Sequence, residues 1–158
     1  MKTKTTNKNS YLNATGPIPY GMTNDYMFRL ILEKNNYVLK GLICSLLALS
    51  PNEISSVEIQ NPILLNKTVD DKEFILDIKV QLNNFAIINL EMQMSNQLNW
   101  RERSLSYLCR VFDQLVHGQL YDEIKPAIHI GFLNFNPTPE LKPEFYASYK
   151  LLNEKSYE

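Results

Sequence analysis

Two carboxylates and an amide recur in this chain at a spacing that could bind a metal ion. Asp77 lies in an extended run, residues 73–80, and Glu91 and Gln93 lie in a second one, residues 85–94. Oxygen ligands on neighbouring strands suit a hard divalent cation, which can assist the hydrolysis of phosphodiesters. The spacing therefore predicts a metal-dependent hydrolytic site with Asp77 and Glu91 as metal ligands.

The alternation of side chains along a strand decides whether these groups can meet. Successive side chains of a strand lie on opposite faces, so Asp77 and Lys79 share one face of the first run. Asn89, Glu91 and Gln93 share one face of the second run, opposite the apolar face formed by Ala86, Ile88, Leu90 and Met92.

The segment that joins the runs, residues 81–84, ends in two asparagines and predicts a tight hairpin turn, because asparagine tolerates positive φ. Folding back there puts Asp77 and Glu91 on one face of adjacent strands. A second interpretation stays open, since acidic residues on the outer face of a two-stranded ribbon are commonly solvated charge. The apolar flank of the second run favours a ribbon that is covered by other elements.

Several stretches together resemble the PD-(D/E)XK nuclease and transposase group that includes the recombination-promoting nucleases. In chain order they are Asn24-Asp25-Tyr26-Met27-Phe28, Ile75-Leu76-Asp77-Ile78-Lys79, Asn89-Leu90-Glu91-Met92-Gln93, residues 101–107, and residues 125–136. The resemblance implies an α/β fold with a restriction-endonuclease-like core, in which a mixed sheet is flanked by helices. It also implies a Mg²⁺-dependent DNA endonuclease, with Mn²⁺ as a substitute, that acts in recombination or mobile-element biology.

The resemblance also assigns roles, with one departure. The general signature of the family ends in lysine, whereas this chain has Gln93, as this group commonly does. Glutamine can orient the attacking water by hydrogen bonding, so the expected catalytic residues are Asp77, Glu91 and Gln93. Lys79 is an auxiliary candidate for the missing positive charge. Asp25 is a second auxiliary candidate, although an acid in the first turn of a helix also compensates the helix dipole without any metal.

A helix expected over residues 98–116 supplies candidate DNA-binding residues. Apolar side chains at helical spacing should pack on the core, namely Leu105, Leu108, Phe112 and Leu115. A polar stripe on the far side would then contact DNA phosphates, and it contains Arg103, Tyr107, Arg110 and Gln114. A solvated helix face without a function is the alternative.

The remaining elements follow from caps and periodicity. We expect a helix from Thr23 or Asn24 to about residue 34, with Met27, Leu30 and Ile31 on its inner side. A second, mostly apolar helix over 36–49 should be buried against the sheet. Strands are expected at 54–59 and 127–135, and a strand-like pattern resumes at 145–152. We assign His117 and His129 to structural roles, and Cys44 and Cys109 to buried apolar positions.

Length and composition predict one main domain. The chain has 158 residues, of which 44% are hydrophobic, enough for a single core. We expect a flexible arm over 1–19, the nuclease-like domain over 20–136, and a linker with the start of a truncated extension over 137–158. Acidic residues concentrate around the expected site, because residues 51–100 carry seven acidic and three basic side chains. A cation would be attracted there, and DNA would be met by flanking basic groups.

Partners and location complete the predictions. No apolar run reaches the roughly 20 residues that span a bilayer, so we expect no membrane partner and a cytoplasmic location. DNA is the expected partner, and a homodimer is left open. The alternative function is a catalytically inactive remnant that keeps the fold and acts as a DNA-binding or partner-binding domain.

Overall fold

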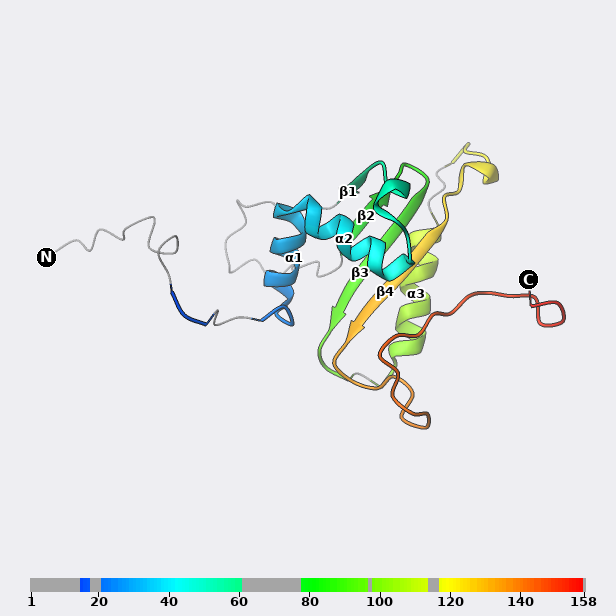
Figure 1. Cartoon of the computed structure of the whole chain (residues 1–158). Coiled ribbons are helices and arrows are strands. Elements are labelled where there is room, and N and C mark those ends of the chain that lie inside the picture. Colours follow the sequence, from blue (N-terminus) through cyan, green and yellow to red (C-terminus); the bar gives the residue numbers. More distant parts are fainter. Residues whose placement is uncertain (1–14, 18–20, 61–77, 97, 114–116, 158) are drawn as a thin grey trace, which may run out of the picture.

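A four-stranded mixed sheet forms the centre of the fold, with helices on both faces (Figure 1). The computed structural model describes residues 15–17, 21–60, 78–96, 98–113 and 117–157. Strand order follows chain order: β1 (Val57–Ile59), β2 (Ile78–Leu82), β3 (Ala86–Gln93) and β4 (Ala127–Leu133). The first two pairings are antiparallel, and β3 pairs with β4 in parallel. The α/β class and the mixed sheet flanked by helices are confirmed.

The hairpin between β2 and β3 is built on its asparagine pair. Asn83 and Asn84 have φ values of 47° and 56°, the positive values that a two-residue hairpin turn requires at both central positions. The backbone N–H of Phe85 closes the turn by donating to the carbonyl oxygen of Leu82 at 2.9 Å. The predicted turn at 81–84 began too early, because Gln81 and Leu82 still belong to β2.

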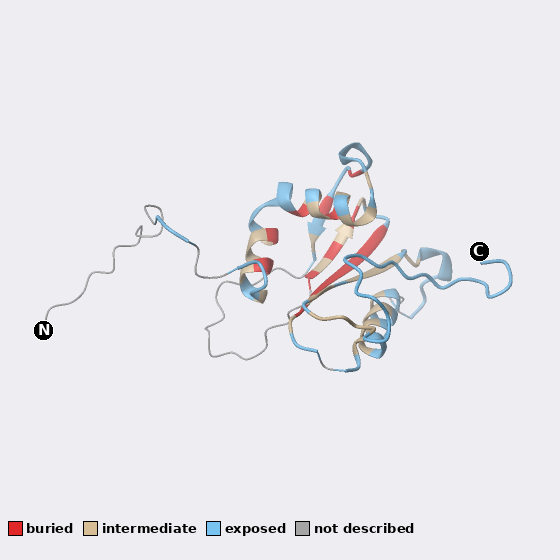
Figure 2. Cartoon of the chain, turned by 60° about the horizontal axis from the view of Figure 1, so that its bottom comes forward, coloured by how far each residue is buried: buried red, intermediate tan, exposed pale blue. Residues whose placement is uncertain are grey.

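Two helices cover one face of the sheet, α1 (Asp25–Lys34) and α2 (Asn36–Leu47). Asn24 caps α1, as its side chain accepts a hydrogen bond from the Met27 N–H at 3.0 Å, and Asn35 caps α2 in the same way. The core lies between these helices and the sheet, where Figure 2 shows the buried segments. It includes Phe28, Leu32, Leu39, Ile43, Ile78, Val80, Leu82, Ala86, Ile88 and Leu90.

Several details of these predicted elements were wrong. The buried residues of α1 are Phe28, Arg29 and Leu32, not the inner side predicted from Met27, Leu30 and Ile31, so the helix is rotated about its axis. The second helix ends two residues early, since Ala48 adopts a left-handed conformation with φ of 53°. This helix is also less buried than predicted, since Tyr37 is 87% exposed.

Differences also affect the strands and one cysteine. The first strand is shorter than predicted, and the predicted strand at 145–152 is absent, because that described segment pairs with no strand. Instead the hydroxyl of Tyr146 donates to the Leu46 carbonyl of α2 at 3.1 Å. Cys44 is half-buried, but Cys109 is exposed, contrary to the prediction.

The opposite face of the sheet is covered by α3 (Trp100–Phe112), which connects β3 to β4. Trp100, at the start of this helix, lies against β4, with ring centroids 5.8 Å from His129. A Cβ atom at Gly131 would overlap the indole ring of Trp100. Gly131 therefore lets the N-terminal end of α3 approach the sheet closely, which sets the position of every later side chain of the helix.

Among the described residues, no helix has the length and apolarity needed to cross a membrane.

We predict that Gly131→Ala lowers the free energy of unfolding by about 1–3 kcal/mol, because the new methyl group forces the Trp100 ring away from the sheet. Gly41→Ala in α2 is the matched control, since a Cβ there meets nothing within 4 Å. The control should raise stability by roughly 0.5–1 kcal/mol through helix propensity. Urea unfolding of both variants measures the difference, and equal stability of the two would contradict the close packing of Trp100.

Candidate functional site

The carboxylate of Glu91 is buried between β3 and α3. Glu91 is 1% exposed, and its neighbours on the same face of β3, Asn89 and Gln93, are 4% and 9% exposed. The polar face of this strand is therefore covered by the helix, and the alternative of solvated charge does not hold for Glu91. An ionised carboxylate in such a place needs compensating charge, because its desolvation costs several kcal/mol.

Arg103 of α3 supplies that compensation. Its Nη2 atom lies 2.7 Å from Oε1 of Glu91, and the two side chains are 30% and 2% exposed. Burial is the largest influence and by itself would lower the pKa of Arg103, but the interactions with Glu91 and Tyr107 together outweigh it, so the pKa lies above the ordinary value. The guanidinium of Arg103 therefore stays positively charged beside Glu91.

His129 of β4 lies on the other side of Glu91. The Nε2 atom of His129 is 3.8 Å from Oε2 of Glu91, and the imidazole side chain is 3% exposed. Burial, with the positive charge of Arg103, lowers the pKa of His129 from 6.5 to about 4. The ring is therefore neutral at pH 7. Its Nδ1 atom lies 3.2 Å from Nδ2 of Asn89, the residue beside it in the parallel register.

Tyr107 of α3 contacts both His129 and Arg103. Its ring stacks on His129 with a centroid distance of 5.6 Å, and its hydroxyl accepts a hydrogen bond from Nη2 of Arg103 at 3.2 Å. The guanidinium carbon of Arg110 lies 5.9 Å from the centroid of the Tyr107 ring on the more exposed side. Arg103 and Tyr107 thus belong to the buried cluster around Glu91, whereas Arg110 is exposed.

This arrangement reverses the predicted orientation of the helix. Leu105 and Phe112, which should have packed on the core, are 53% and 51% exposed, whereas Arg103 and Tyr107 face the sheet. Of the other two residues of the predicted apolar stripe, Leu108 is half-buried and Leu115 lies outside the described residues. The prediction assumed that the apolar stripe of a helix meets the protein interior. Here the sheet face under the helix is polar, so the polar stripe provides the matching partners.

The sequence analysis assigned His129 to a structural role and did not indicate that its ring lies beside Glu91, with Nε2 3.8 Å from Oε2. What brings His129 to the site is the parallel pairing of β4 with β3, which aligns His129 with Asn89 and Gly131 with Glu91. A strand pairing that spans 40 residues is not visible in local periodicity.

Other predicted site residues have mixed positions. Gln93 lies two residues beyond Glu91 on the same face, and its Nε2 donates to the Ser95 carbonyl at 2.8 Å. Lys79 pairs across the hairpin with Asn89 and so lies on the site face. Asp77 and Gln114 lie outside the described residues. Asp25 begins α1 on the opposite face of the sheet, and its buried Oδ1 has no hydrogen-bond partner among the described residues.

The donor set suits a hard cation, although it is incomplete within the described part of the chain. There, no group of three or more His, Cys, Asp or Glu side chains gathers as a metal site. Glu91 already holds a positive group, the guanidinium of Arg103, at 2.7 Å. A carboxylate and an amide two residues apart are oxygen ligands of the kind that Mg²⁺ prefers. The oxygen ligands are thus of the right kind, but a cation bound there would have to share Glu91 with Arg103.

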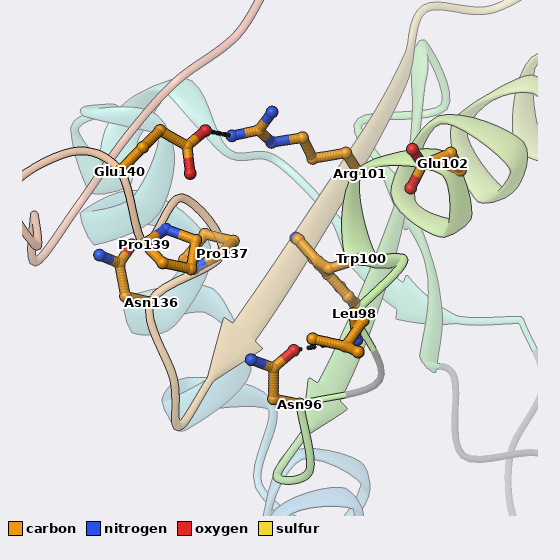
Figure 3. Close-up of a pocket in the computed structure, with 9 residues that line it drawn as sticks. All are labelled: Asn96, Leu98, Trp100, Arg101, Glu102, Asn136, Pro137, Pro139 and Glu140. Carbon is orange, nitrogen blue, oxygen red and sulfur yellow. Dashed lines mark hydrogen bonds and ion pairs between the residues drawn. The ribbon is translucent and has the colours of Figure 1, made fainter.

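A separate pocket lies at the N-terminal end of α3, between that helix and residues 136–140 (Figure 3). An ion pair between Arg101 and Glu140 spans it. Trp100 lines this pocket and also contacts His129, so one side chain separates the pocket from the Glu91 cluster. Glu91 itself does not line it.

Comparison with known proteins gives one match. The sequence model of the PD-(D/E)XK nuclease family transposase matches residues 22–158. No curated protein and no solved structure gives a significant match.

We predict that Arg103→Met lowers the free energy of unfolding by about 1–3 kcal/mol, because it leaves the Glu91 charge buried without its partner. The double variant Arg103→Met/Glu91→Gln should recover part of the loss, since no unpaired charge remains. Arg110→Met, at an exposed arginine of the same helix, is the control. Urea unfolding of the three variants measures the coupling, and a double variant no more stable than Arg103→Met would contradict it.

We also predict that His129 makes the fold sensitive to acid. The unfolded ring binds a proton below pH 6.5, but the folded ring does so only near pH 4. Stability from this group is thus fully present above pH 6.5 and is lost as the pH falls to about 4, by roughly 3 kcal/mol. The variant His129→Gln should lose less stability across that window than the parent protein in urea unfolding at stepped pH. Parallel losses in both proteins would refute this.

Proposed function

The chain belongs to the PD-(D/E)XK nuclease family transposases, and on this basis we propose that it is a metal-dependent DNA endonuclease of recombination or mobile elements. The observation that carries the proposal is the buried, charged Glu91 two residues before Gln93 on the central strand β3. A structural role alone would not require an ionised carboxylate in the interior, because an apolar residue there avoids its desolvation.

We propose Asp77 and Glu91 as the metal ligands, with Mg²⁺ as the natural ion and Mn²⁺ as a substitute. The support is the hairpin register, in which Ile78 pairs with Leu90 and Lys79 with Asn89. If the antiparallel pairing continues by one residue, Asp77 stands opposite Glu91. Directly opposed residues of an antiparallel pair share one face of the sheet. Asp25, whose buried Oδ1 has no hydrogen-bond partner in the described part of the chain, remains an auxiliary candidate.

The roles of the neighbouring residues follow from their chemistry. A bound divalent cation would neutralise charge on the scissile phosphate and lower the pKa of the attacking water. Gln93 can orient that water through its amide, which both donates and accepts hydrogen bonds. Lys79 lies on the same strand face and adds a positive charge near the phosphate. Both Lys79 and Gln93 lie on the strands that would carry the metal ligands.

Arg103 has two partners in the proposed cycle. In the structure its guanidinium pairs with Glu91 at 2.7 Å, and a cation on Glu91 would weaken that pairing by competition. The guanidinium then becomes available to a phosphate oxygen, which it binds well because its donors are planar and paired. Tyr107 keeps it in place through the hydrogen bond at 3.2 Å. Arg110 and Gln114 are proposed as outer contacts to the DNA backbone.

A second candidate function has one observation in its favour. Arg103 already neutralises Glu91, which is the arrangement expected of an inactive remnant that binds DNA or a protein partner. Calorimetry separates the two, since the remnant should bind Mn²⁺ at no specific site. The wider proposal also includes the domain division at residues 20 and 136, a cytoplasmic location and an optional homodimer, which sedimentation at several concentrations would detect.

We predict that the protein nicks or linearises plasmid DNA in the presence of Mg²⁺. Asp77→Ala and Glu91→Gln should each reduce cleavage by roughly 100-fold or more, because each removes a proposed metal ligand. Glu58→Gln, at an exposed acid of β1, is the control and should cleave like the parent. Cleavage by Asp77→Ala at the parental rate would remove Asp77 from the mechanism.

A further inference from the structure

The proposed mechanism leaves one buried polar group of the site without a role. The Nε2 atom of His129 is inaccessible to solvent and has no hydrogen-bond partner among the described residues. A charged group lies beside it, because Oε2 of Glu91 is 3.8 Å away. A buried polar atom without a partner is costly, so its presence calls for an explanation.

The partner of the opposite ring nitrogen fixes where the proton lies. Nδ1 of His129 lies 3.2 Å from the amide nitrogen of Asn89. An amide nitrogen only donates, so Nδ1 must accept, and the single proton of a neutral imidazole then lies on Nε2. The N–H that results is on the side of Glu91. Asn89 is itself 4% exposed, so water does not replace it as a partner.

The ring is also held in place by its neighbours. Tyr107 stacks on it at 5.6 Å with an interplanar angle of 21°, and Trp100 lies 5.8 Å away at 34°. With the ring fixed between two aromatic side chains, Nε2 cannot turn toward another acceptor. The ring therefore has one orientation relative to the carboxylate.

We propose that His129 is a positioning residue for Glu91, and that Asn89 sets the tautomer with which it acts. The two oxygens of Glu91 then lie between two donors from different elements, Arg103 on Oε1 and His129 on Oε2. The contact at 3.8 Å is longer than a hydrogen bond and acts as an attraction between the N–H dipole and the charge. It keeps the carboxylate plane fixed when Arg103 is displaced. The positioning role rests on the proposed function, because Glu91 is positioned for metal binding. The assignment of the tautomer does not depend on it.

The tautomer can be measured without any metal or DNA. Proton–nitrogen correlation NMR of the full chain with ¹⁵N-labelled histidine, at neutral pH, should show His129 protonated on Nε2 alone. His117→Gln removes the other histidine, which is exposed, and so assigns the signals. In Asn89→Asp the carboxylate can only accept, so the proton should appear on Nδ1. A parent ring protonated on Nδ1, or a signal unchanged by Asn89→Asp, would overturn the assignment.

The positioning role is tested by cation binding. His129→Phe keeps an aromatic ring between Tyr107 and Trp100 but has no donor, and it should bind Mn²⁺ about 10–100-fold more weakly in calorimetry. His129→Gln restores a donor and should recover part of the affinity, whereas His117→Gln should bind like the parent. Circular dichroism verifies that each variant is folded. Parental affinity in folded His129→Phe would refute the positioning role.

The two levels of the proposal fail in different ways. If the parent protein binds no Mn²⁺, the proposed function fails and the positioning role fails with it, while the NMR result still decides what Asn89 does to the ring. If the parent binds Mn²⁺ and folded His129→Phe binds it equally well, the proposed function stands and the role of His129 is wrong.

Discussion

The burial of the Glu91 charge is the constraint on which the rest of this structure depends. A carboxylate that is 1% exposed is tolerated only beside a positive group, because the cost of dehydrating it is several kcal/mol. The helix that covers it must therefore present its polar side inward. This explains why Arg103 and Tyr107 face the sheet and why Leu105 and Phe112 are left more than half exposed.

One strand serves both layers of the molecule. Alternate residues of β3 point into the core under α1 and α2, and the residues between them point to α3. Both faces of the strand are therefore buried, as the burial pattern shows. A shift of one residue in its pairing would exchange core and site, since it moves every side chain to the other face. The asparagine turn at 83–84 prevents this shift, because Asn83 binds the backbone of Ser55, Ser56 and Glu53.

Local patterns predicted the elements of this fold better than the contacts between them. The asparagine cap of α1, the hairpin turn and the polar face of β3 follow from nearest-neighbour chemistry, and the structure has all of them. The orientation of α3 could not be predicted from its own sequence. The helix turns its polar side chains toward the polar face of the sheet, although it also has an apolar stripe. His129 was missed for a related reason: its neighbour Asn89 is 40 residues away. Asp77 and Gln114 stay predictions, since they lie outside the described residues.

Trp100 has one more consequence. It is the single tryptophan of the chain, and its indole ring lies between Gly131, the His129 imidazole and the pocket at the start of α3. Fluorescence excited selectively in tryptophan therefore originates beside the candidate site, against the His129 ring. Any occupant that moves α3 relative to β4 would change the colour or intensity of that light, so the molecule carries its own optical reporter.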